Sequence, residues 1–171
     1  IRMVSRQLDV VILGKLYGAE IVGIYKIAKE IANLIAKLTD PVYQAIYPEF
    51  AKMLANGKKL EAKQMAIKIS LYAGGAGLAF GKEFLGAYDV TLVYFIAIFV
   101  AIITLPLYPM QHAFGYAKKA FTNQLQTTLV YIPLLFILTF YFEMVGASIA
   151  YIFYYTYLSR LTLNSVKKGF K

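Results

Sequence analysis

The sequence lacks cysteine and tryptophan and has a single histidine, His112. Without cysteine there are no disulfides and no thiolate metal ligands. One histidine argues against an imidazole-based metal site or a catalytic triad. The Walker A, Gly-x-Ser-x-Gly and His-Glu-x-x-His motifs are also missing from the chain. We therefore predict no catalytic residue, no metal and no cofactor, and a protein that is not an enzyme.

Charge is scarce as well, at 16% of the 171 residues, whereas hydrophobic residues make up 60%. A soluble domain carries about a quarter charged residues. The mean hydropathy is +0.60, and the excess lies in long uncharged runs, which are typical of membrane-spanning helices. The sequence predicts an all-α fold, a polytopic transmembrane helix bundle that forms a single domain over residues 1–171.

About six segments are expected, of which the first is truncated and the third is short. A polar connector at 55–68 joins the second segment to the third, and a basic tail at 160–171 follows the last segment. Pro41 restarts the second segment, which continues to about Leu54, and Pro106 and Pro109 interrupt the fourth. The six apolar runs are 8–16, 19–39, 69–80, 90–111, 120–142 and 144–159.

Positive charge exceeds negative charge, with 18 Lys and Arg against 9 Asp and Glu. A nucleic-acid partner is one explanation, but the lysines gather in short loops between apolar runs, which fits the positive-inside rule better. If the short run 69–80 crosses the membrane, the connector, the Lys118-Lys119 pair and the tail share one side, and Lys15 and Lys82 fall on the other. We therefore predict this crossing, a cytoplasmic C-terminus and no nucleic-acid partner.

The second segment carries a polar stripe on an otherwise apolar helix. At 100° per residue, its five members fall within an arc of about 100°. A central lysine costs about 2.5–3.5 kcal/mol on a membrane-insertion scale, so the stripe is expected to avoid lipid. Two interpretations remain: it lines a cavity that takes an anionic ligand, or it lies on the membrane surface against headgroups. The polar stripe consists of Lys26, Lys29, Glu30, Asn33 and Lys37.

Other polar and small residues have structural alternatives too. Arg6 and Asp9 stand three residues apart and are suited to neutralise charge at an interface or between helices. The polar residues from Thr122 to Thr128 line a hydrophilic path, form hydrogen bonds between helices or lie at the membrane interface. The glycines at 74, 75 and 77, and the Gly146–Ala150 pair, indicate close helix packing.

An ordered set of short motifs covers nearly the whole chain. It comprises Asp9, Leu13-Gly14, Gly18-Ala19, Val22-Gly23, Tyr25, Ala28, Pro41, Pro48-Glu49, Gly81 to Phe84, Pro106 to Pro109 with Gly115, and Gly146-Ala147 with Ala150. In this order the motifs resemble the C-terminal half of bacterial polysaccharide flippases, the O-antigen and capsule repeat-unit exporters of the multidrug/oligosaccharidyl-lipid/polysaccharide superfamily. The chain begins as if inside a helix, which we interpret as the start of a fragment that lacks an N-terminal bundle.

The resemblance implies a transporter whose two bundles enclose a cavity in the bacterial inner membrane. Such a flippase moves a polyprenyl-pyrophosphate-linked oligosaccharide for cell-surface polysaccharide or lipopolysaccharide synthesis. Membrane lipids, the lipid-linked oligosaccharide, polysaccharide polymerase and glycosyltransferases are the partners it implies. The polar stripe would face the cavity, and Asp9 would take part in ion coupling. The alternatives are a drug or metabolite exporter of the same superfamily, and a non-transporting fragment or assembly module.

Overall fold

The computed structural model describes residues 7–37, 40–81 and 89–170, and every element within these ranges is a helix. The prediction of an all-α fold is confirmed for this part of the chain. In order, the helices are α2 (Leu8–Tyr17), α3 (Ala19–Lys37), α4 (Asp40–Ala55), α5 (Lys59–Gly81), α6 (Asp89–Ile103), α7 (Leu107–Ala113) and α8 (Ala117–Phe170).

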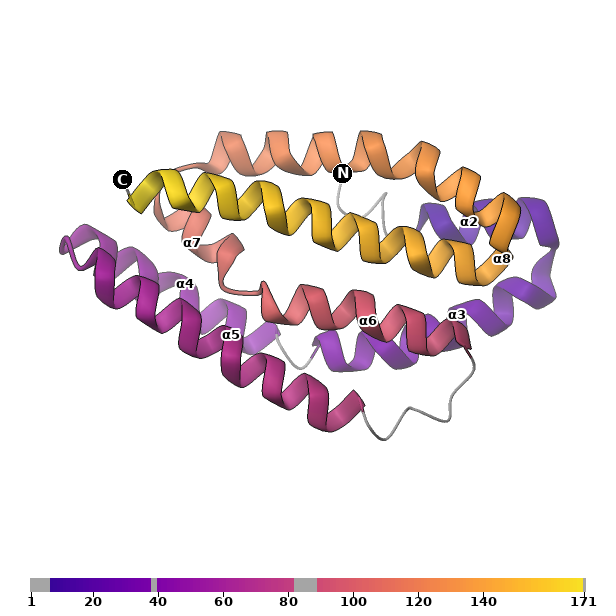
Figure 1. Cartoon of the computed structure of the whole chain (residues 1–171), viewed down its shortest axis with the longest axis horizontal. Helices are drawn as coiled ribbons and strands as arrows, with labels where there is room; N and C mark the ends of the chain where they lie inside the picture. The colour runs from indigo at the N-terminus through magenta and orange to yellow at the C-terminus, as the bar shows by residue number, and fades with distance from the viewer. Residues whose placement is uncertain (1–6, 38–39, 82–88, 171) are drawn as a thin grey trace.

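Helix α8 is two antiparallel helices joined at a sharp break (Figure 1). The backbone leaves helical geometry at Phe142 (φ −127°) and Glu143 (φ 49°, ψ −128°), which separates an N-terminal half, residues 117–141, from a C-terminal half, residues 144–170. This break lies at the boundary predicted between the fifth and sixth segments. The predicted tail, however, is helical to Phe170. It continues the helix because its apolar and small residues keep helical spacing: Leu158, Thr162, Ser165 and Val166 are all buried.

Helix α5 is longer than the apolar run that predicted it. It starts at Lys59, so the expected polar connector shrinks to a turn at residues 56–58 around Gly57, whose φ is +72°. Ala62 and Ala66 are buried, with Met65 and Ile69 partly buried beside them, which gives one apolar face at helical spacing. The charges of the expected connector occupy the other faces, and the helix continues through them.

The interruption predicted at Pro106 is confirmed, whereas Pro109 lies inside α7 (Leu107–Ala113), in its first turn, where proline is tolerated. Helix α6 ends at Ile103 and α7 begins at Leu107, with Pro106 between them. A proline cannot donate the backbone hydrogen bond that would continue α6. The short α7 that follows brings Met110 into a small core with Phe50 of α4 and Val166 of α8.

The ends of the helices gather at two opposite ends of the molecule (Figure 1). The α4–α5 turn, the α7–α8 turn and the C-terminal end of α8 share one end, and the α2–α3 turn and the break in α8 share the opposite end. Helix α6 lies in the middle, where it contacts α3, α5 and α8. The main core forms around α6 and contains four fully buried tyrosines, Tyr25, Tyr94, Tyr131 and Tyr151.

The N-terminal half of α8 buries several amide and hydroxyl side chains, together with Tyr131 and Leu135, and exposes large apolar ones. Its buried face carries Asn123, Gln124, Thr127, Thr128 and Thr139, and its exposed face carries Phe121, Leu125, Leu129, Ile132, Phe136 and Phe140. The buried amides form hydrogen bonds across to the C-terminal half: Gln124 donates to Tyr154, and Asn123 donates to Ser165 at 3.2 Å. Among the described residues, two stretches are long and apolar enough to cross a membrane, 90–113 and 117–170.

Candidate functional site

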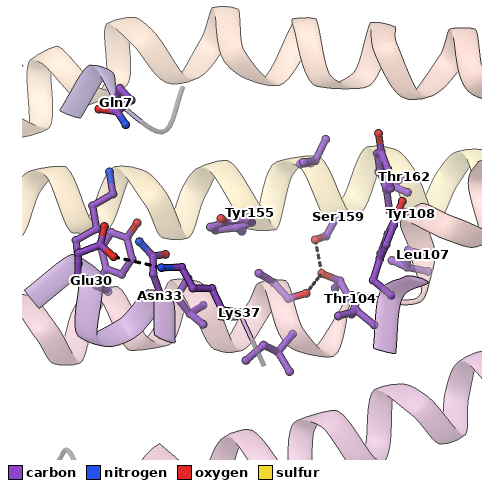
Figure 2. Close-up of a pocket in the computed structure, with 18 of the residues that line it drawn as sticks. Gln7, Glu30, Asn33, Lys37, Thr104, Leu107, Tyr108, Tyr155, Ser159 and Thr162 are labelled. Carbon is purple, nitrogen blue, oxygen red and sulfur yellow. Dashed lines mark hydrogen bonds and ion pairs between the residues drawn. The ribbon is translucent and has the colours of Figure 1, made fainter. Parts of the chain in front are cut away.

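A pocket of about 530 Å³ lies between α3, the α6–α7 region and the C-terminal half of α8, with the start of α2 at its edge. All five residues of the polar stripe line it. Figure 2 shows Glu30, Asn33 and Lys37 toward one end, Leu107 and Tyr108 toward the other, and Tyr155 between them. The structure thus brings the predicted residues together around one space, and their role in binding a substrate stays a prediction.

Helical periodicity on α3 creates this face. Tyr25, Ala28 and Ala32 follow the i, i+3, i+7 spacing and pack into the main core. Three of the polar-stripe residues lie beside that buried face and remain exposed: Lys26, Glu30 and Lys37. The helix is therefore anchored by its apolar face, and its polar face is held against the pocket.

Lys29 is the exception in the stripe, because its side chain is only 8% exposed and forms an ion pair with Asp9 of α2. Its Nζ lies 2.6 Å and 2.9 Å from the two carboxylate oxygens of Asp9. The Tyr25 hydroxyl donates a third hydrogen bond to Asp9 at 2.6 Å. Asp9 is fully buried, so a single carboxylate receives an ammonium and a phenol out of contact with water.

A tyrosine cluster surrounds this ion pair. The Lys29 ammonium donates to the Tyr151 hydroxyl at 3.4 Å and lies 5.1 Å from the centroid of the Tyr151 ring. Tyr94 and Tyr131 pack on Tyr151 with ring centroids 5.0 Å and 5.6 Å away. Rings of this kind stabilise a buried cation through their negative faces. Lys29 therefore lines the pocket, and its ion pair with Asp9 and its contact with Tyr151 join α2, α3 and α8.

The outer part of the stripe is less constrained. Lys37 Nζ lies 3.7 Å from Glu30 Oε2, with side chains 64% and 57% exposed (Figure 2). Lys26 is exposed and forms no ion pair among the described residues. Since Asp9 neutralises Lys29 and Glu30 lies near Lys37, Lys26 contributes the uncompensated positive charge of this pocket.

The facing wall comes from parts of the chain more than fifty residues away in sequence. Ser159 donates to Thr104 Oγ1 at 2.9 Å, which ties α8 to the end of α6 (Figure 2). Thr104 in turn donates to the carbonyl of Val100 at 2.7 Å. Tyr94, Tyr108 and Tyr155 add aromatic surface. The pocket therefore offers lysines on one side and tyrosine rings and hydroxyls on the other.

Sequence reasoning missed this facing wall and the partner of Asp9. Arg6, the partner considered for Asp9, lies outside the described residues, and the partner that the structure gives is Lys29. One signal was present: Asp9 and Tyr25 both belong to the ordered motifs of the N-terminal part, and here they share a hydrogen bond. The described residues contain no group of three His, Asp or Glu side chains that could hold a metal ion.

Comparison with models of known protein families gives a match over the first part of the chain. A family model described as "Polysaccharide biosynthesis protein" matches residues 1–72, which include α2, α3, α4 and the first part of α5. The matched part contains Asp9 and the whole polar stripe. No curated protein and no solved structure matches the chain. Over this part the chain is similar to proteins that act in polysaccharide synthesis or export.

Proposed function

We propose that the chain is the membrane-embedded C-terminal bundle of a polysaccharide flippase and that the pocket beside α3 is its share of the substrate cavity. The observation that carries this proposal is the pocket itself. The part of the chain that is similar to polysaccharide biosynthesis proteins supplies a cationic wall, and distant helices close it with tyrosines and hydroxyls.

The inverted N-terminal half of α8 supports insertion in a membrane. In water, apolar groups are buried and polar groups face solvent, because exposing apolar surface costs about 25 cal/mol per Å². Here amides and hydroxyls face inward, whereas Leu129, Phe136 and Phe140 are 63%, 52% and 59% exposed. Lipid is the solvent that favours this arrangement. Each half of α8 is long enough to cross, since 25 residues of helix extend about 37 Å.

The pocket also supports the cavity interpretation of the stripe over the membrane-surface one. A helix that lies on the membrane turns its polar face to water and headgroups. Helix α3 instead turns its polar face to a pocket walled by α6, α7 and α8. The lysines therefore face a space lined by protein instead of lipid, and charged side chains within a membrane are tolerated in such spaces.

The chemistry of the pocket fits a lipid-linked oligosaccharide. Lys26 and Lys37 suit the negative charge of a pyrophosphate or an acidic sugar. Tyrosine rings stack on the apolar faces of sugars, and the hydroxyls of Ser159 and Thr162 suit sugar hydroxyls. In this proposal the substrate is a polyprenyl-pyrophosphate oligosaccharide, the location is the bacterial inner membrane with a cytoplasmic C-terminus, and polymerase and glycosyltransferases act in the same pathway.

The test reverses charge in the full-length protein, expressed in a bacterium whose own flippase gene is deleted. Lys26→Glu with Lys37→Glu is expected to abolish surface polysaccharide while the protein stays in the membrane at its normal level. Lys52→Glu with Lys63→Glu is the matched control, because both lysines are exposed and neither lines the pocket. Normal polysaccharide in the pocket variant contradicts the proposal. Lost drug resistance with normal polysaccharide identifies the exporter of drugs or metabolites instead.

A further inference from the structure

The charged residues that line the pocket beside α3 all come from one wall. Among the described residues they are Lys26, Lys29, Glu30 and Lys37, and each of them lies on α3. The lining from α4, α6, α7 and α8 carries no charge and consists of apolar side chains, tyrosines and hydroxyls. The pocket therefore has a charged part and a neutral part, which suit different groups of one ligand.

Hydrogen bonds within the protein fix what the hydroxyls of the neutral part can offer. Thr104 Oγ1 donates to the carbonyl of Val100 at 2.7 Å, and because a carbonyl can only accept, Thr104 has no proton left for a ligand. Ser159 Oγ lies 2.9 Å from Thr104 Oγ1 and donates its own proton there (Figure 2). Ser159 is half-buried and lines the pocket, so its oxygen offers a ligand an acceptor and not a donor.

An acceptor at this position distinguishes a sugar from a phosphate. An ionised phosphate carries acceptor oxygens, so beside Ser159 it would lose hydrogen bonds with water and gain none. A sugar hydroxyl has a proton to donate, and it satisfies the Ser159 oxygen. The neutral part of the pocket therefore favours an uncharged group with hydroxyls.

Aromatic rings lie at the same end of the pocket. Tyr43 of α4 and Tyr108 of α7 line it, with ring centroids 6.0 Å apart and ring planes inclined by 36°. The ring of His112 contacts that of Tyr108 at a centroid distance of 4.5 Å, which supports the Tyr108 ring within α7. Figure 2 shows Tyr108 toward the same end as Thr104 and Ser159. A pyranose has an apolar face of C–H groups, and burying that face on an aromatic ring is favourable.

We propose that Tyr43, Tyr108 and Ser159 form a subsite for the sugar that is joined to the pyrophosphate. In this sugar subsite a sugar hydroxyl donates to Ser159 Oγ and the pyranose packs on Tyr108, while the pyrophosphate lies toward Lys26 and Lys37. The inference rests on the proposed function and adds the direction of the substrate in the pocket. The reverse direction would place phosphate oxygens against the acceptor of Ser159.

The test compares two soluble ligands of equal charge. Both are pyrophosphate diesters with a citronellyl chain in place of the long polyprenyl chain, and the second ester group is either N-acetylglucosamine or methyl. Calorimetry with the full chain in detergent micelles gives a dissociation constant for each, and their ratio is the sugar preference. We expect the sugar ester to bind about ten-fold more tightly than the methyl ester.

Variants of the sugar subsite should lower this preference and leave binding of the methyl ester unchanged. Ser159→Ala removes the acceptor and is expected to lower the preference about five-fold. Tyr108→Leu is expected to lower it as well, whereas Tyr108→Phe keeps the ring and should keep the preference. Thr156→Ala is the matched control for Ser159, because Thr156 lies on the same half of α8, is exposed and does not line the pocket. An unchanged preference in Ser159→Ala or in Tyr108→Leu overturns the sugar subsite.

Further outcomes separate this inference from the proposed function. Lys26→Glu with Lys37→Glu is expected to weaken both ligands by the same factor, so the sugar preference stays. If that variant loses the preference but still binds the methyl ester, the sugar lies beside the lysines and the proposed direction is wrong. Equal binding of both esters by the unaltered chain overturns the sugar subsite alone. Binding of neither ester overturns the sugar subsite and the proposed function together.

Discussion

At the scale of single residues, Lys29 differs from the rest of the polar stripe in what it does. Its ammonium is held by Asp9 and contacts Tyr151, so its charge is used inside the protein. Lys26 and Lys37 keep exposed side chains. A charge reversal at Lys29 would place two carboxylates in one buried site and would unfold the region, whatever the pocket binds. For this reason the functional test uses Lys26 and Lys37 only.

Breaking the buried ion pair on one side should destabilise the protein strongly. Lys29→Met leaves the Asp9 carboxylate buried without a cation, which costs about 3–5 kcal/mol in the free energy of unfolding. Asp9→Asn with Lys29→Met removes both charges and keeps an acceptor for the Tyr25 hydroxyl, so it should recover most of that loss. The measurement is the free energy of unfolding in detergent micelles by denaturant titration.

Lys37→Met is the control for this pair. Its ion pair with Glu30 is 3.7 Å long and exposed, and such pairs contribute less than about 1 kcal/mol. A double variant at Asp9 and Lys29 that is as unstable as Lys29→Met alone would contradict the charge explanation. It would show instead that the lost packing of the lysine side chain dominates.

At the scale of elements, Gly146 sets how closely the two halves of α8 approach. A Cβ atom on Gly146 would lie 1.9 Å from the backbone oxygen of Leu138, so only glycine fits. The buried Ala147 and Ala150 continue the close contact. The helix contact predicted from the Gly146–Ala150 spacing is therefore confirmed. The polar residues of the N-terminal half also join the two halves, because Asn123, Gln124 and Gln126 form hydrogen bonds to the C-terminal half, as one interpretation of that cluster predicted.

Gly146→Ala should push the two halves apart. The added methyl group forces a backbone shift, which typically costs about 1–3 kcal/mol of stability. Thermal unfolding in detergent measures this as a lower midpoint. Gly75→Ala is the matched control, because nothing lies within 4 Å of its added Cβ and alanine favours a helix by up to about 1 kcal/mol. Equal midpoints for the two variants would mean that Gly146 does not limit the approach.

The same elements show what periodicity in a sequence can and cannot predict. Proline and glycine are local signals, so the break at Pro106 and the turn at Gly57 were visible in the sequence. The sequence did not show where α5 begins or that α8 continues to Phe170. Both stretches are rich in charge, and a count of charged residues does not reveal that they lie on one face of a helix whose other face is apolar. Lys59 and Lys167 lie on helices whose other faces pack against neighbours.

At the scale of the whole molecule, one half of the candidate site was predictable and the other was not. The arc of Lys26, Asn33 and Lys37 follows from 100° per residue alone. Predicting the wall with Thr104 and Ser159 requires knowledge of how α6 and α8 pack around the pocket. That packing depends on the combined apolar surfaces of many residues and not on a local pattern. The partner of Asp9 was ambiguous for the same reason, since a lysine twenty residues away became its neighbour only through the packing of α2 on α3.

The arrangement of turns predicts the topology of the chain in a membrane. Lysines at the α4–α5 turn, the α7–α8 turn and the end of α8 gather at one end of the molecule (Figure 1). From the positive-inside rule we predict that this end faces the cytoplasm. Helix α5, with 23 residues, is about 34 Å long, which matches a hydrocarbon core of about 30 Å in length, but its first half is charged and it is not one of the two stretches that are apolar enough to cross.

Single cysteines test this topology cleanly, because the chain has none. We expect Lys58→Cys, Lys118→Cys and Lys167→Cys to react with an impermeant maleimide only after the cells are opened. Glu143→Cys at the break in α8 and Gly81→Cys at the far end of α5 should react in intact spheroplasts. The pair Lys58 and Gly81 is decisive for α5, because the two positions are its ends. Labelling of both from the same face would mean that α5 lies along the membrane, and the charge asymmetry that favours a cytoplasmic C-terminus would then disappear.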